Sequence, residues 1–187
     1  MLPQSICGLL VTAQAGPIAR AWGLTAGALT IATTLSPLAN GGGRIFWGQV
    51  SDRIGRETTM IVAFAINAVC LMLVLTLGRV SGIWFTLTLL PTYFTWGEIY
   101  GLFPAAVTDY FGTRHATSNN SVLYTSKGVA SLVAGGFAAG IFERYGTWSP
   151  AFYGSAALAL IAAILAVGLR AAAAPSGSRL GVAATAD

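Results

Sequence analysis

Two basic residues, Arg44 and Lys127, lie inside stretches of sequence that otherwise have the character of membrane-spanning helices. A charged side chain at the centre of a bilayer costs at least about 2.5–3.5 kcal/mol by insertion scales, so such residues usually face a protein interior or a watery cavity. Arginine offers a planar fork of donors to a carboxylate, and lysine offers a point charge. Because few acidic residues accompany them, the two cations indicate a site that binds an anion.

Three residues of the fourth apolar segment are candidates for the same site. Trp96 and Tyr100 are four residues apart and share one face of a helix, whereas Glu98 points elsewhere. The two rings could wall off a small flat anion, and packing between helices is the alternative explanation. Glu98 could pair with one cation, carry a proton, or form a structural hydrogen bond to a broken backbone.

The helical rise puts the two cations at similar depth. Arg44 lies eight residues before Asp52, about 12 Å inward along a helix, and Lys127 lies ten residues beyond Thr117, about 15 Å inward. Thr117 is a candidate N-cap of its helix. Both helices start from the same side, so the cations could clamp two ends of one dicarboxylate, or one carboxylate and its water. Snorkelling of each side chain to the lipid headgroups is the alternative.

The composition places these residues in a membrane protein. The chain has 187 residues, of which 55% are hydrophobic and 9% charged, whereas soluble domains carry about 25% charged residues. The basic residues are dispersed, which argues against nucleic-acid binding. A single histidine, His115, excludes a multi-histidine metal site, and Cys7 and Cys70 have no metal-binding or disulfide spacing. No catalytic constellation occurs, so we expect neither an enzyme nor a cofactor.

Hydropathy divides the chain into six apolar segments joined by short connections. Each complete segment can cross a hydrocarbon core about 30 Å thick. The sequence therefore predicts an all-α, polytopic membrane protein with six transmembrane helices in residues 1–170 and a disordered tail over 171–187. The first segment is short for a span, so we expect that it is the remainder of a longer helix. The segments are 1–19, 25–50, 59–78, 82–106, 118–142 and 150–170.

Basic residues at the segment ends set the expected orientation. Five arginines at one set of ends against three at the other place the connection at 51–58, the connection at 107–117 and the tail in the cytoplasm. Glycines inside the spans predict close helix contacts, and prolines inside the spans predict bends. The five arginines are Arg53, Arg56, Arg114, Arg170 and Arg179; the glycines include Gly41–Gly43, Gly135, Gly136 and Gly140; the prolines are Pro37, Pro91 and Pro104.

The connection after the second segment carries the pattern G-x-x-x-D-R-x-G-R, formed by Gly48, Asp52, Arg53, Gly55 and Arg56. The glycines permit tight packing and a sharp turn. The aspartate can accept hydrogen bonds from a helix N-terminus, and the arginines can bind helix C-termini and lipid headgroups. This pattern between two apolar segments resembles the signature cytoplasmic loop of the major facilitator superfamily, with an ordinary positive-inside hairpin as the alternative.

Four stretches resemble one family of that superfamily, the oxalate/formate antiporters. They read LLVTAQAGPIA, NGGGR, WGEIYGLF and LYTSKG and begin at Leu9, Asn40, Trp96 and Leu123. The resemblance implies exchange of small carboxylates such as oxalate and formate across a bacterial cytoplasmic membrane. It also implies that Arg44 and Lys127 bind the carboxylate and that Trp96 and Tyr100 line the cavity.

Members of the superfamily have twelve helices in two halves, with the signature loop once in each half. The resemblance therefore implies that residues 1–170 are the C-terminal half, that the C-terminus is cytoplasmic, and that an N-terminal six-helix half is the missing partner. The predicted mechanism is alternating access. A proton-coupled monocarboxylate transporter that uses Glu98 and an inactive transporter fragment are the alternatives.

Overall fold

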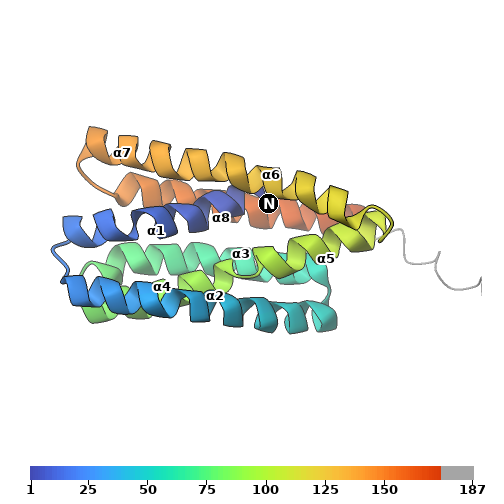
Figure 1. Cartoon of the computed structure of the whole chain (residues 1–187), viewed down its shortest axis with the longest axis horizontal. Helices are drawn as coiled ribbons and strands as arrows, with labels where there is room; N and C mark the ends of the chain where they lie inside the picture. The colour runs from blue at the N-terminus through green and yellow to red at the C-terminus, as the bar shows by residue number, and fades with distance from the viewer. Residues whose placement is uncertain (174–187) are drawn as a thin grey trace, which may run out of the picture.

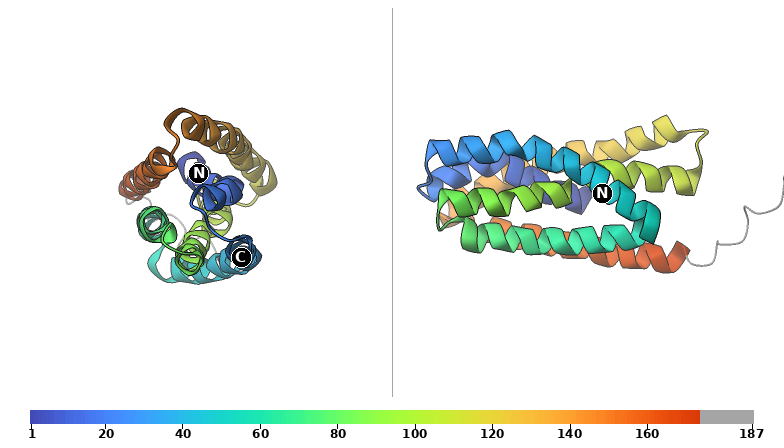
Figure 2. Two further views of the ribbon diagram at one scale, coloured as in Figure 1. Left: turned by 90° about the vertical axis from the view of Figure 1, so that its left-hand side faces the viewer. Right: turned by 90° about the horizontal axis from the view of Figure 1, so that it is seen from below.

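The computed structural model describes residues 1–173, and every regular element in that range is a helix. The helices run close to one direction and form an elongated bundle (Figure 1), which Figure 2 shows nearly end on in its left-hand view. The predicted all-α fold class is confirmed. The elements are α1 (Leu2–Ala21), α2 (Ala26–Ile54), α3 (Arg56–Leu73), η1 (Val74–Gly78), α4 (Gly82–Trp96), α5 (Ile99–Phe111), α6 (Ala116–Leu132), η2 (Val133–Phe137), α7 (Ala138–Tyr145) and α8 (Ser149–Ala173), where η marks a π-helical segment.

Helices occupy all six apolar segments, and three continuous helical stretches are long and apolar enough to cross a membrane. These stretches are Arg56–Gly78, Ala116–Tyr145 and Ser149–Ala172. α2 has sufficient length, 29 residues, but its mean hydropathy is lowered by glycine, asparagine, serine and charged side chains. α4 and α5 are each too short to cross a membrane because the helix is interrupted between them.

Three predicted boundaries differ from the structure. The connection expected at 51–58 is helical except for Gly55, whose φ of +88° makes a sharp corner between α2 and α3 that glycine adopts without a Cβ penalty. α6 begins at Ala116, so Thr117 lies inside the first turn and His115 occupies the N-cap position. α8 continues through Ala173, past the predicted start of the tail at 171, and the rest of that tail lies outside the described residues.

The fourth apolar segment, expected as one helix over 82–106, is broken at Gly97 and Glu98. Both residues keep right-handed helical dihedral angles, but the backbone hydrogen bonds here join residues three apart instead of four. Tyr100 N donates to Gly97 O at 3.3 Å, and Gly101 N donates to Glu98 O at 3.0 Å. The break lies between the two prolines that were expected to bend this segment, Pro91 and Pro104.

α2 packs directly against this break. A Cβ atom on Gly97 would lie 2.3 Å from the carbonyl oxygen of Asn40, and a Cβ atom on Gly43 would lie 2.0 Å from the carbonyl oxygen of Phe94. The two backbones can approach this closely only because each contributes a glycine. By contrast, a Cβ atom on Gly136 or Gly140 would have no described atom within 4 Å, so the close packing expected at these glycines is not seen within residues 1–173.

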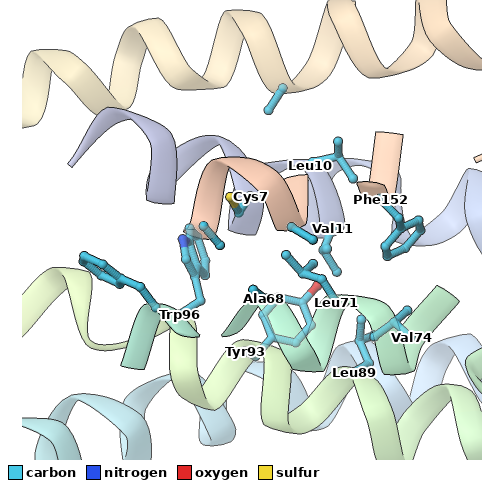
Figure 3. Close-up of a cluster of buried hydrophobic side chains, with 14 of the residues drawn as sticks. Cys7, Leu10, Val11, Ala68, Leu71, Val74, Leu89, Tyr93, Trp96 and Phe152 are labelled. Atoms are coloured by element: carbon cyan, nitrogen blue, oxygen red, sulfur yellow. The ribbon is translucent and has the colours of Figure 1, made fainter. Parts of the chain in front are cut away.

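The core fills the space between α1, α3, α4 and α8. Figure 3 shows Cys7, Tyr93, Trp96 and Phe152 among its buried side chains. The Cys7 thiol donates to the carbonyl oxygen of Ser155 on α8 at 3.0 Å. This cysteine is therefore a packed, hydrogen-bonded part of the α1–α8 contact.

Candidate functional site

Arg44 on α2 and Lys127 on α6 converge on one aromatic ring, that of Tyr100 on α5. The guanidinium carbon of Arg44 lies 4.1 Å from the ring centroid, and the Lys127 Nζ atom lies 4.6 Å from it. Both distances are within the range of about 6 Å in which a cation is attracted to the face of an aromatic ring. The two charges can therefore be no farther apart than the sum of these distances, so three helices build one site.

Trp96 packs against the ring of Tyr100. Its ring meets that of Tyr100 edge to face, with centroids 5.6 Å apart, although the two residues belong to different helices, α4 and α5. Trp96 is buried against α1, where a Cβ atom on Gly8 would lie 2.0 Å from the indole. The close-up in Figure 3 shows it next to Cys7 of α1. Trp96 therefore packs between Tyr100 and α1, as part of the hydrophobic core.

Neither cation is neutralised by a carboxylate in the described part of the chain. Arg44 donates instead to the neutral Asn40 Oδ1, from Nε at 3.3 Å and from Nη2 at 2.9 Å. No Asp or Glu oxygen of residues 1–173 lies within 4.0 Å of Lys127 or Arg44. Arg44 is exposed and Lys127 is half-buried in the described part of the chain.

Glu98 lies apart from these cations. It is fully buried at the helix break, beside the equally buried amide of Gln4 on α1. Its two carboxyl oxygens have no hydrogen-bond partner of good geometry, and it forms no ion pair with Arg44 or Lys127 within the described range. Burying an unpaired carboxyl group is costly, so Glu98 is an unusual polar group inside the packed core at the helix break.

The G-x-x-x-D-R-x-G-R segment forms the corner between α2 and α3, and Arg56 ties it to α5. Its guanidinium contacts Asp52 at 2.7 Å and Asp109 at 3.1 Å, which joins the ends of three helices. Arg53 is exposed, and a Cβ atom on Gly48 would have no described atom within 4 Å. Within the described residues, Arg56 is the arginine of this segment that forms ion pairs with carboxylates.

A second contact strengthens the same junction. The hydroxyl of Tyr110 on α5 donates to the Glu57 carboxylate in the first turn of α3. Partial burial, together with the neighbouring Glu57 and Asp109 carboxylates, raises the pKa of Tyr110 to about 12. The phenol therefore remains a hydrogen-bond donor throughout the neutral and moderately alkaline range.

Removing the long-range partner of Arg56 is expected to have a small effect. Asp109→Asn should lower the free energy of unfolding by no more than about 1 kcal/mol, because both side chains reach solvent and Asp52 still pairs with Arg56. The difference should shrink at high ionic strength. Thermal unfolding in detergent at low and high salt tests this, and a salt-independent loss of several kcal/mol would contradict it.

Asn40 was not singled out as a functional residue from the sequence. It is four residues before Arg44, so the two share one helix face, and it is the first residue of the NGGGR stretch; these two signals could have identified it. Asp109 gave no such signal, because its partner is far away in the sequence and on another helix.

The bundle is predominantly apolar and contains three helical stretches that are long and apolar enough to cross a membrane, which is the character of an integral membrane protein. The profile of the Major Facilitator Superfamily matches residues 5–184, and the chain belongs to this superfamily of transporters. The family resemblance inferred from the sequence motifs is thus confirmed.

Individual relatives agree with this assignment. The chain is 43% identical over 159 residues to the oxalate:formate antiporter of Oxalobacter formigenes, and these aligned residues cover 85% of this chain and 38% of that protein. It is 28% identical over 101 residues to an uncharacterised MFS-type transporter of Escherichia coli (strain K12), covering 54% of this chain and 25% of that protein. It is 27% identical over 124 residues to apicoplast pyruvate carrier 2 of Toxoplasma gondii, covering 62% of this chain and 19% of that protein. The chain thus spans less than two fifths of each of these relatives.

Proposed function

We propose that residues 1–170 form the C-terminal six-helix half of a secondary transporter that exchanges small carboxylates, such as oxalate and formate, by alternating access. The observation that carries the proposal is the convergence of Arg44 and Lys127 on Tyr100 without a neutralising carboxylate in the described residues. The 43% identity to an oxalate:formate antiporter supports the choice of substrate class.

The arrangement suits a small flat anion. Arg44 can present two parallel N–H groups to one carboxylate, and Lys127 can reach another carboxylate oxygen or the far end of a dicarboxylate. Before the anion binds, the ring of Tyr100 attracts both cations and so partly offsets their mutual repulsion. The rings of Tyr100 and Trp96 then form an apolar wall that excludes water from one side.

The same charges explain exchange rather than leak. An empty site keeps two uncompensated positive charges, which hinder the change between inward-facing and outward-facing states because that change encloses them away from water. A bound carboxylate offsets them, so the loaded protein changes between inward-facing and outward-facing states more readily. An N-terminal half supplies the opposite wall of the cavity, in a bacterial cytoplasmic membrane with the C-terminus in the cytoplasm.

Glu98 favours one second candidate, a proton-coupled monocarboxylate transporter. A fully buried carboxyl without a cationic partner in the described residues can hold a proton and release it when its surroundings change. This candidate predicts uptake driven by a pH gradient, and it predicts that Glu98→Gln abolishes that dependence. Exchange of one carboxylate for another needs no such gradient.

Counterflow in proteoliposomes separates the two candidates. The product of the complete reading frame is reconstituted, loaded with oxalate, formate or lactate, and supplied with labelled oxalate outside. We expect uptake that depends on an internal carboxylate and changes less than about twofold when a pH gradient is imposed, because the site exchanges one anion for another. Uptake that needs the gradient favours the proton-coupled alternative, and absence of any uptake favours an inactive fragment.

A further inference from the structure

We propose that Asn40 is a positioning residue for Arg44: it fixes the guanidinium through a neutral acceptor, so that the orientation is set while the positive charge stays available to an anion. The proposal concerns the carboxylate site described above and rests on that function. It assigns a task to a residue that is not itself charged and that lies one helical turn from the cation.

The hydrogen bonds define the role of each atom of the Asn40 amide. Its Nδ2 group donates to the carbonyl oxygen of Tyr93, at 3.3 Å, in the last turn of α4 before the helix break. A carbonyl oxygen can only accept, so the nitrogen must face Tyr93 and the oxygen must face Arg44. That oxygen receives both Nε and Nη2 of the guanidinium, while Nη1 has no partner within residues 1–173.

The position of Asn40 is itself fixed by packing. Its backbone carbonyl lies against Gly97: a Cβ atom on Gly97 would be 2.3 Å from the Asn40 carbonyl oxygen. One turn later, a Cβ atom on Gly101 would be 3.6 Å from the carbonyl oxygen of Arg44. α2 therefore cannot rotate or slide on the α4–α5 break without losing these contacts. The guanidinium is consequently held in register with Tyr100, which follows the break on the same segment.

Only a neutral amide serves both contacts. An aspartate would still accept from Arg44, but it would form an ion pair that competes with the anion, and it would face the carbonyl oxygen of Tyr93 without a donor. An alanine would leave the flexible arginine side chain without its anchor. The structure thus predicts a specific order of effects, in which the isosteric charged residue harms anion binding more than truncation does.

Asn67 provides a matched control. It is a buried asparagine on α3 whose Nδ2 group donates to the carbonyl oxygen of Thr92 at 3.2 Å and to Thr95 Oγ1 at 2.8 Å. It therefore anchors the same turn of α4 but has no hydrogen bond to an arginine in the described chain. Substitutions there report the cost of losing a helix–helix hydrogen bond without any change at Arg44.

The first test observes Arg44 directly and needs no transport. The chain is labelled with 15N-arginine in lipid nanodiscs, the Arg44 Nε–H signal is assigned with Arg44→Lys, and its exchange with water is measured. Asn40→Ala should accelerate exchange at least about tenfold because the charge-assisted hydrogen bond is lost. Asn40→Asp should keep it slow, and Asn67→Ala should leave it within about twofold. An unchanged rate in Asn40→Ala would overturn the proposal.

The second test measures binding of labelled oxalate by the product of the complete reading frame. Affinity should fall about tenfold in Asn40→Ala and about a hundredfold in Asn40→Asp, and should change less than about twofold in Asn67→Ala. Native affinity in Asn40→Asp would show that the neutrality of residue 40 is irrelevant and would overturn the proposal. If the unsubstituted protein binds no oxalate, the proposed function fails, and the exchange rate of Arg44 Nε–H alone decides whether Asn40 positions that side chain.

Discussion

Lys127→Gln is expected to reduce carboxylate exchange about a hundredfold in the product of the complete reading frame, because one of two charges that hold the anion is lost. Glutamine keeps most of the side-chain length and a donor group, so the loss reports the charge rather than the shape. Counterflow of labelled oxalate in proteoliposomes provides the measurement.

Two further variants give that result its meaning. Lys127→Arg restores the charge and should retain a measurable part of the exchange, since the ring of Tyr100 can also attract a guanidinium. Arg144→Gln removes an exposed cation from α7, on the same continuous helical stretch but outside the site, and should leave exchange within about twofold. Full exchange by Lys127→Gln would refute the anion-clamp mechanism.

The second large effect concerns packing rather than charge. Gly43→Ala should destabilise the protein by about 3 kcal/mol or more, because the new Cβ atom would lie 2.0 Å from the backbone oxygen of Phe94, and backbone cannot move aside as a side chain can. Thermal unfolding of the purified chain in detergent should show a correspondingly lower midpoint, and helix α2 should lose its alignment with the α4–α5 break.

Gly41→Ala is the matched control, two residues away in the same run of three glycines. A Cβ atom there would have no described atom within 4 Å, so alanine should leave stability unchanged or raise it by up to about 1 kcal/mol through its better helix propensity. Equal midpoints for the two variants would show that the close approach of α2 to Phe94 does not contribute to stability.

The class of protein and the positions of its helices follow from the amino-acid order. Six apolar stretches must form helices if they are to enter a membrane, since their backbone groups would otherwise lack hydrogen-bond partners. The same reasoning marked Arg44 and Lys127, because a charge inside such a stretch requires a protected surrounding. The G-x-x-x-D-R-x-G-R pattern then identified the superfamily without any three-dimensional information, which the match over residues 5–184 confirms.

The helix ends were less predictable, since they depend on local geometry that hydropathy does not measure. Gly55 could be expected to make a turn, but not to be the whole connection between α2 and α3. The break at Gly97 was likewise hidden, because hydropathy is continuous across residues 82–106 and does not show that the backbone of Asn40, on another helix, packs against this point.

The relations between side chains of different helices were decided by the tertiary structure alone. Helical periodicity shows which residues share a face, but the rotation of each helix about its axis is fixed by its contacts, here by the close approach at Gly43 and Gly97. That rotation brings Arg44 to the ring of Tyr100, which Lys127 reaches from α6, and Glu98 stays away from both cations. The two cations could be found in the sequence because charge in an apolar segment is conspicuous. The hydrogen bond from the Asn40 amide to the Tyr93 carbonyl could not, because it depends on how α2 packs against α4.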